Sequence, residues 1–555
     1  MRMLQSNADV ARRTEACTRI FRAAILARRR VCLHTSPMTS PKRVLSRLPS
    51  WPRRLILACL VGCSAPPATR PNVVFIAVDD LRPALGAYGD PVALTPNIDR
   101  LARSGAVFLQ AHAQQAVCNP SRASLMTGLR PDSLRVWDLD TDFRVTTPGV
   151  VTLPQHFRAN GYDAVSIGKI YHNVLPDTAS WSEPELHVSG FPYDPDAVYH
   201  HRDNLAIQER RKAAILQAGT QARSIDRYGL WYLKANATES VDLPDSVYYD
   251  GAQTNLALRK LAELKTRGRP FFFGIGYYRP HLPFNAPQRY WDLYHRDSIP
   301  LPSNFYPTRD GPIMAASTMR ELRGYTDFAN AKHPFDGSLS EAEVRRLRHG
   351  YYASVSYVDA QVGRVLDQLD SLGLTENTIV VLWGDHGYKL GEHNGWAKMT
   401  NYIIDTHSPL LVSAPGRIAP GTRVNRMVEF VDVYPTLVEL AGLPPAPHTQ
   451  GTSAVPLLRD GTRPWKPAVF SQFLRAGTWA APDSQPYMGY SLLTDDHHYV
   501  RWIHWETKAL VARELYDRRR DPDENENLAA RPGSAALLDS LERQRVAGWR
   551  AALPR

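Results

Sequence analysis

Cysteine is scarce in this sequence of 555 residues. The five cysteines are Cys17, Cys32, Cys59, Cys63 and Cys118, so only Cys118 lies beyond residue 63. A body with one cysteine can form neither an internal disulfide nor a zinc site built from several cysteines. The body also lacks internal repeats and low-complexity blocks. With 43% hydrophobic and 22% charged residues, its composition excludes a collagen-like or disordered protein.

Most of the chain also lacks net charge. The formal charge of +11 would by itself indicate nucleic acid or an anionic membrane as a partner. However, residues 1–62 contain 13 of the 66 Lys and Arg but only 2 of the 55 Asp and Glu, which leaves 53 of each sign in residues 63–555. We therefore expect the body not to bind nucleic acid.

The amino-terminal segment, residues 1–62, has the features of an export leader. Pro52–Arg54 precede the apolar run Leu55–Val61, which is too short to span a bilayer. The tetrad Leu60–Cys63 resembles a bacterial lipobox, so we expect lipidation of Cys63 and a periplasmic or outer-membrane-anchored lipoprotein in a bacterium. A simple cleaved signal or an N-terminal anchor is the alternative. Met38 would give a leader of ordinary length and is the start that we expect.

Apolar runs alternate with helical patterns through the centre of the chain. The runs predict buried strands at Val73–Val78, Asp163–Ile167, Phe271–Gly276, Thr378–Trp383 and Leu410–Ser413. Helices are predicted from Thr95-Pro96 to Gly105, over Gly251–Lys265, and over Ser340–Leu372, which opens with the capping box Ser340-x-x-Glu343. This alternation predicts an α/β fold with a mostly parallel central sheet flanked by helices. A ligand site is then expected at the carboxyl ends of the strands.

The same patterns predict the domain organisation. After a tether at 63–71, we expect a main domain at 72–443. Residues 173–250 lack clear periodicity, which indicates an insertion. Beyond the Pro-rich stretch Pro444–His448, residues 449–555 alternate like an antiparallel sheet and end in a helix around Ala535–Ala551. They predict a smaller C-terminal α+β subdomain.

Acidic residues follow two of the predicted strands. Asp79-Asp80 come directly after Val73–Val78, and Asp385-His386 follow the strand at Thr378–Trp383. Adjacent carboxylates repel each other, and a divalent cation relieves that repulsion. A solvated or capping pair is the alternative for Asp79-Asp80 alone, but the repetition of an acidic motif at a second strand end favours a metal site. His386 is a less natural ligand than Asn for calcium, which prefers oxygen donors.

A further segment combines a cysteine with a potential anion site. Cys118-Asn119-Pro120-Ser121-Arg122 precedes Ala123–Gly128, where a helix is expected to begin. A helix N-terminus directs free backbone N–H groups toward an anion. The alternative is a small buried cysteine beside a proline turn.

The segment Cys118–Gly128 resembles the C-x-P-S-R-x-x-x-x-T-G motif of type I sulfatases, whose cysteine is oxidised to formylglycine. The resemblance extends from Asn72 to about Leu528. Four segments are similar to the iduronate-2-sulfatase branch: Gly168–His172, Gly276–Phe284, Gly384–Lys398 and Glu514–Asp517. The resemblance implies an alkaline-phosphatase-like fold in which 72–443 is the catalytic domain. It also implies calcium rather than magnesium, formylglycine at Cys118 and a formylglycine-generating maturation enzyme as partner.

The resemblance also assigns a role to each site residue. The metal ligands that it implies are Asp79, Asp80, Cys118, Asp385 and His386. Arg122 and Lys169 would hold the formylglycine and the metal-bound charge, and His172 would lie beside the aldehyde hydrate. His281 and Lys398 would face the sulfate and its leaving oxygen. Lys169 or Lys398 alone would be interpreted as a surface charge, and His281 alone as a packed loop histidine. Only the joint appearance of these residues in order favours a site.

The implied activity is hydrolysis of a sulfuric ester on a sulfated sugar. By resemblance the substrate is a 2-O-sulfated uronic acid at the end of a glycosaminoglycan fragment. Three alternatives stay open: a sulfatase for another polysaccharide such as an algal one, a phosphonate or phosphodiester hydrolase of the same fold, and a non-catalytic protein that binds sulfated glycans.

Overall fold

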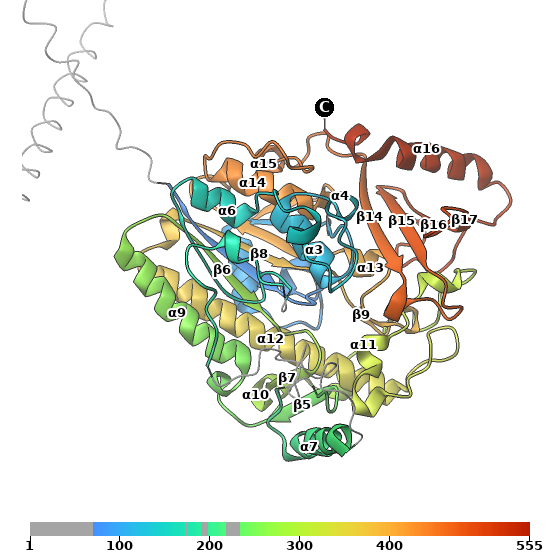
Figure 1. Ribbon diagram of the computed structural model, residues 1–555, viewed down its shortest axis with the longest axis horizontal. Helices are drawn as coiled ribbons and strands as arrows, with labels where there is room; N and C mark the ends of the chain where they lie inside the picture. Colours follow the sequence, from blue (N-terminus) through green and yellow to red (C-terminus); the bar gives the residue numbers. More distant parts are fainter. Residues whose placement is uncertain (1–69, 173–174, 190–197, 218–232, 555) are drawn as a thin grey trace, which may run out of the picture. The chain divides into compact units, whose positions relative to one another are not determined.

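The computed structural model describes residues 70–172, 175–189, 198–217 and 233–554 (Figure 1). The predicted leader, the start at Met38 and the lipidated Cys63 lie outside these residues. Across the described segments, we find no helix with the length and hydropathy needed to cross a membrane.

A seven-stranded sheet forms the centre of the fold. Its strands, in spatial order, are β12 (Thr422–Val424), β2 (Ala106–Phe108), β11 (Leu410–Ser413), β8 (Thr378–Gly384), β1 (Asn72–Val78), β6 (Phe271–Tyr277) and β4 (Asp163–Gly168). β8, β1, β6 and β4 are parallel, whereas β11 runs antiparallel to β8 and β2. The predicted mostly parallel sheet is confirmed, and the five predicted strands agree with the structure to within one residue at each end.

Helices cover both faces of this sheet (Figure 1). Val74, Ile76 and Val78 of β1 face a core shared with α2 (Pro96–Ser104), α9 (Tyr249–Arg267) and α12 (Glu341–Ser371). Val73, Phe75 and Ala77 face the opposite core, which contains α3 (Cys118–Thr127), α6 (Leu153–Ala159) and α14 (Val433–Leu440). Successive residues of a strand point to opposite faces, so a strand buried on both sides is apolar throughout.

Two helix starts differ in how well the sequence predicts them. The capping box of α12 is confirmed, because Ser340 Oγ accepts from the Glu343 N–H while the Glu343 carboxylate accepts from the Ser340 N–H. α3, in contrast, begins at Cys118 rather than at Ala123. Pro120 then lies in the first turn, where its missing N–H removes no intrahelical bond. The predicted start at Ala123 is wrong because a proline in the first turn of a helix resembles a proline that precedes one.

The predicted insertion contains regular structure in its described parts. α7 (Arg202–Gln217) and β5 (Thr238–Val241) lie within it, and β5 pairs in parallel with β7 (Phe284–Pro287). Asn204 is the only residue of α7 that is buried. The helix therefore lacks the apolar stripe by which a sequence pattern reveals a helix.

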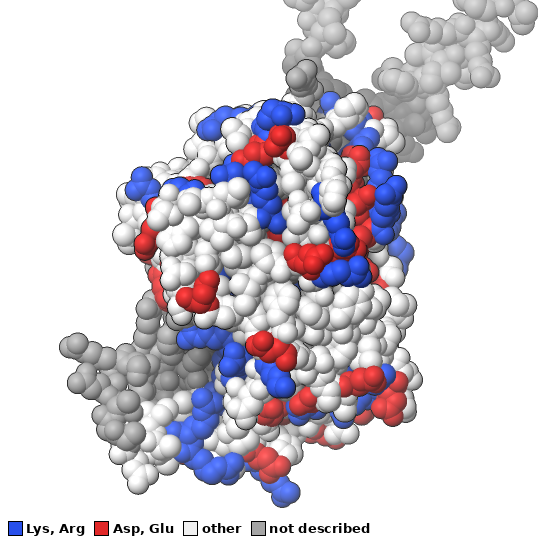
Figure 2. Space-filling view, turned by 90° about the vertical axis from the view of Figure 1, so that its right-hand side faces the viewer, with Lys and Arg blue, Asp and Glu red and all other residues white. Residues whose placement is uncertain are grey.

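An antiparallel sheet follows near the carboxyl terminus, as predicted. Its strands are β14 (Ala468–Arg475), β15 (Tyr487–Thr494), β16 (His497–His504) and β17 (Leu510–Asp517). α16 (Ala535–Ala551) covers one face through Leu538 and Leu541, and the other face packs against Met314 and Tyr402. Basic and acidic side chains are interspersed on this side of the molecule (Figure 2).

Short elements complete the connections. They are β3 (Ala111–His112), α4 (Pro131–Leu134), α5 (Phe143–Thr146), α10 (Gln288–Trp291), α11 (Arg320–Arg323), β9 (Lys389–Leu390), β10 (Trp396–Ala397), α13 (Ile403–Thr406), β13 (Val428–Glu429) and α15 (Val455–Arg459).

Candidate active site

Neighbouring parallel strands end together and bring two acidic motifs into contact. β1 and β8 pair with Val78 opposite Gly384, so the next residues, Asp79 and Asp385, emerge side by side. Arg122 of α3 joins them, with Nη2 2.9 Å from Asp79 Oδ1 and Nε 2.9 Å from Asp385 Oδ2. One buried guanidinium therefore links the ends of two strands.

Lys169 follows β4 and reaches the same acidic residue. Its Nζ lies 2.6 Å from Asp79 Oδ2. The preceding Gly168 has φ of +73°, and a Cβ at this position would lie 2.3 Å from the carbonyl oxygen of Gly276. Only glycine fits this left-handed turn without displacing the backbone of β6. The turn directs Lys169 toward the end of β1.

Asp80 adopts a left-handed conformation, with φ of +59°. Its N–H donates to Asp385 Oδ1 over 3.0 Å, and its carbonyl accepts from the Tyr351 hydroxyl over 2.9 Å. Lys398, which follows β10, places Nζ 2.8 Å from each carboxylate oxygen of Asp80. Such strained backbone in a non-glycine residue is typical of functional sites, where the surroundings enforce it.

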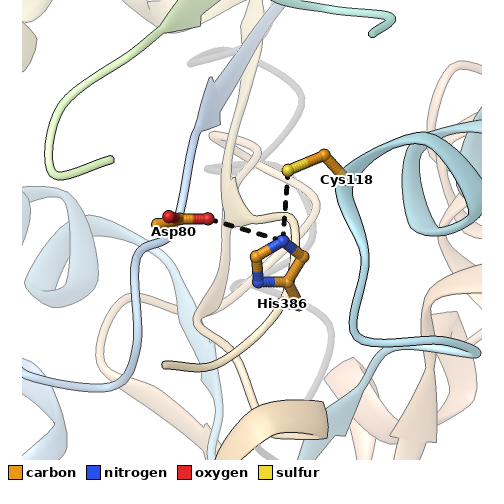
Figure 3. Close-up of side chains that lie close together, drawn as sticks. All are labelled: Asp80, Cys118 and His386. Atoms are coloured by element: carbon orange, nitrogen blue, oxygen red, sulfur yellow. Dashed lines mark hydrogen bonds and ion pairs between the residues drawn. The ribbon is translucent and has the colours of Figure 1, made fainter. Parts of the chain in front are cut away.

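Cys118, at the first position of α3, lies beside His386 and Asp80 (Figure 3). His386 Nδ1 is 3.0 Å from the Gly387 carbonyl oxygen, which can only accept, so Nδ1 carries a hydrogen. In the neutral ring, Nε2 then has a lone pair. Nε2 lies 3.4 Å from Cys118 Sγ and 3.5 Å from Asp80 Oδ1. This arrangement is typical of a metal-binding histidine, whose second nitrogen donates to a carbonyl.

Two further histidines lie near this cluster. His281 Nε2 is 3.9 Å from Asp80 Oδ2 and 2.9 Å from Oε1 of Glu321. His172 has a buried Nδ1 without a hydrogen-bond partner among the described residues. Burial and the neighbouring Lys169 lower the pKa of His172 well below its ordinary value, so the imidazole is neutral and can accept a proton.

The cluster combines buried carboxylates with an equal number of buried cations. Asp79, Asp80 and Asp385 are matched by Arg122, Lys169 and Lys398. Burial alone would raise the pKa of Asp79, but Lys169 and Arg122 hold it well below its ordinary value. Burial and Asp79 raise the pKa of the Cys118 thiol well above its ordinary value, so the unmodified side chain is a protonated thiol at neutral pH.

The same residues supply a set of donors that suits a divalent cation. Ligand atoms of Asp80, Cys118 and His386 lie within 4.8 Å of one another, as do those of Asp79, Cys118 and Asp385. Carboxylate oxygens are the donors that a hard divalent cation prefers, and His386 Nε2 offers a further lone pair. The donors present therefore fit a metal ion.

One residue of this network was not predicted from the sequence. Glu321 of α11 contacts both Lys398 and His281. Within Arg320–Arg323 it has the appearance of a solvated charge on a surface helix. No sequence pattern could have revealed it, because its partners are 40 and 77 positions away.

Comparisons with known proteins identify the family of this chain. The sulfatase family matches residues 71–443, and the family of the N-sulphoglucosamine sulphohydrolase C-terminal region matches residues 391–549. The chain is 33% identical to iduronate 2-sulfatase of Mus musculus over 539 residues, which covers 85% of this chain and 93% of the mouse protein. The Homo sapiens iduronate 2-sulfatase is also 33% identical, over 82% of this chain and 90% of that protein.

A solved structure shows the same fold. The phosphonate monoester hydrolase of Agrobacterium radiobacter superposes with a TM-score of 0.64 at 23% identity, and the match covers 87% of this chain and 96% of the hydrolase. The expected alkaline-phosphatase-like fold is thereby confirmed. The chain belongs to the sulfatase family and is a sulfuric ester hydrolase.

Proposed function

We propose that this sulfatase removes the 2-O-sulfate of a uronic acid in a glycosaminoglycan fragment, using calcium and a formylglycine at position 118. The convergence of three buried carboxylates and three buried cations around Cys118 carries the proposal. The name of the mouse and human relatives supports the choice of sugar.

Calcium would be held by the carboxylates of Asp79, Asp80 and Asp385, by His386 Nε2 and by the modified residue 118. Bound there, it would neutralise the sulfate oxygens and increase the acidity of a hydroxyl group. His386 is compatible with this role because its Nδ1–H is already bound to Gly387. Oxygen donors predominate in this set, which favours calcium over a softer metal.

Conversion of Cys118 to formylglycine would supply the nucleophile that the thiol itself does not. A protonated, buried thiol is a poor nucleophile. The hydrated aldehyde would supply two hydroxyls on one carbon, one to attack sulfur and the other to lose a proton as sulfate leaves. Its place at the first turn of α3 favours binding of an anion. A maturation enzyme that oxidises Cys118 is therefore a required partner.

The chain's own residues would provide charge and proton transfer. Arg122, Lys169 and Lys398 place fixed positive charge where the sulfate gains negative charge in the transition state. His281 would protonate the leaving sugar oxygen, a step that contributes roughly 10²–10⁴-fold to the rate. His172, held neutral by burial and Lys169, would accept the proton of the second hydroxyl.

We also propose that the mature protein is an exported lipoprotein with its lipid on Cys63. The apolar run before Cys63 and the concentration of basic residues in 1–62 support this proposal. Mass analysis of the mature N-terminus tests it: an intact residue 1 would contradict export by this leader.

Two measurements test the enzyme proposal. Mass spectrometry of the peptide around Cys118, from protein made in its native host, should show a loss of about 18 Da, the difference between a thiol-bearing side chain and an aldehyde. Cys118→Ala should abolish release of sulfate from a 2-O-sulfated uronate disaccharide, and Cys118→Ser is its matched control for side-chain size. An unmodified thiol or an active Cys118→Ala protein would contradict the proposal.

The substrate class requires its own comparison, because the phosphonate monoester hydrolase shares the fold. Rates of the wild-type protein on matched sulfate and phosphonate esters should favour the sulfate. Faster hydrolysis of the phosphonate would assign the site to that chemistry instead. Desulfation of an algal polysaccharide but not of the disaccharide would overturn only the choice of sugar.

A further inference from the structure

Glu321 lies between two groups of the candidate active site. Its Oε1 is 2.9 Å from His281 Nε2 and 3.0 Å from Lys398 Nζ, and its Oε2 is 2.9 Å from the same Nζ. The side chain is 9% exposed, so these contacts are formed largely out of contact with water. Burial alone would raise the pKa of Glu321, but Lys398 and His281 hold it well below its ordinary value. Glu321 is therefore a carboxylate.

The contacts of His281 show what Glu321 does to the ring. His281 Nδ1 lies 2.6 Å from the carbonyl oxygen of Leu282, and Nε2 faces Glu321 from the opposite edge. An acceptor at each nitrogen fixes the plane of the imidazole. Without Glu321 the ring would retain the contact with Leu282, and Nε2 would lose the 2.9 Å contact that holds it toward Asp80.

The position of Lys398 also depends on Glu321. Its Nζ is shared between Glu321 and the two carboxylate oxygens of Asp80. Asp80 belongs to a group of candidate metal-binding residues, whereas Glu321 belongs to none of them among the described residues. A metal ion would compete for Asp80 and leave Glu321 as the carboxylate that restrains the ammonium group.

We propose that Glu321 is a positioning residue that holds His281 and Lys398 on the leaving-group side of the active site. This inference rests on the proposed function, in which His281 protonates the leaving oxygen. Small displacements of a proton donor reduce its contribution strongly, because proton transfer requires hydrogen-bond distance. The contribution of the proton donor to the rate is largest when the leaving group is an alkoxide, which leaves poorly without a proton. It is smallest when the leaving group is a phenolate, which is stable without a proton.

The test compares two substrates that differ in this respect, 4-nitrophenyl sulfate and a 2-O-sulfated uronate disaccharide. Glu321→Gln preserves the size of the side chain but removes its charge, and Glu321→Asp retains the charge on a shorter side chain. Glu392→Gln is the matched control. Glu392 is also 9% exposed and contacts two cations, Arg82 at 2.8 Å and Arg348 at 3.7 Å, neither of which is a proposed site residue.

We expect Glu321→Gln to lower kcat/KM for the disaccharide by about 10- to 100-fold and for 4-nitrophenyl sulfate by less than about threefold. Glu321→Asp should be intermediate, and Glu392→Gln should affect both substrates alike. Equal losses on both substrates in Glu321→Gln, or no loss on either, would overturn the inference.

A structural measurement separates this inference from the proposed function. If wild-type protein with modified Cys118 hydrolyses neither ester, the proposed function is wrong, whatever Glu321 does. If it hydrolyses only 4-nitrophenyl sulfate, the proposed sugar substrate is wrong, again whatever Glu321 does. Crystal structures of wild-type and Glu321→Gln proteins then decide the inference. It requires that the His281 ring and the Lys398 ammonium group change position in the variant, and unchanged positions would overturn it.

Discussion

Arg122 offers a direct test of how the buried charges stabilise the site. Its guanidinium pairs with Asp79 and Asp385, and all three side chains are 0% exposed. Removing one partner of a buried ion pair costs about 3–5 kcal/mol, because the remaining charge has no solvent to compensate it. The two pairs share one guanidinium, so their energies do not add, and we expect Arg122→Ala to lose about 4 kcal/mol. Arg122→Lys keeps the charge but cannot reach both carboxylates, and should lose about 2 kcal/mol.

Denaturant unfolding in the presence of a chelator measures these losses without a contribution from bound metal. Arg100→Ala is the control, because Arg100 Nη2 pairs with Asp367 Oδ1 at 2.7 Å while the two side chains are 41% and 65% exposed. An exposed pair of this geometry contributes less than about 1 kcal/mol. If Arg122→Ala shifts the unfolding midpoint no more than Arg100→Ala does, burial does not increase the contribution of the ion pair to the free energy of unfolding, and the reasoning is wrong.

Three further predictions concern the backbone, pH and metal. Gly168→Ala should lower kcat/KM about 100-fold by displacing Lys169, whereas Gly268→Ala, also at positive φ but with open space around the added Cβ, should leave it unchanged in steady-state assays. Burial and Lys389 hold the pKa of His393 at about 4 against an ordinary 6.5. The unfolded chain therefore binds the proton first, and about 3 kcal/mol of stability should be lost as pH falls from 6.5 to 4. His393→Gln should remove this part of the pH dependence of denaturant unfolding, and equal slopes in both proteins would contradict it. Chelation should lower both activity and the melting temperature, with recovery on adding calcium, and Asp385→Asn should reduce bound calcium in elemental analysis. A melting temperature that chelation leaves unchanged would count against a metal at these carboxylates.

The central sheet was predictable because its strands are buried on both faces. A run such as Val73–Val78 has apolar side chains on every residue, and this pattern leaves few alternatives. α7 could not be predicted in the same way, since its only buried residue is the polar Asn204. The start of α3 was placed too late because a proline in the first turn resembles a proline before a helix.

The sequence by itself determined which residue types are available for chemistry. Several features can be read directly from the order of the residues. They are the two acidic motifs after buried strands, the segment from Cys118 to Arg122 and the balanced charge of residues 63–555. They were sufficient to indicate a site at one edge of a parallel sheet, because chain direction fixes where the strands end.

Only the tertiary structure decided how these groups contact one another. The pairing of Asp79 and Asp385 through Arg122 depends on the register of the strands. The direction of Lys169 depends on the left-handed backbone at Gly168, which the residue types around it do not reveal. The position of Glu321 beside His281 and Lys398 depends on packing between segments far apart in the chain. Burial then determines the energy of each contact, since the same ion pair is weak in water and strong where water is excluded.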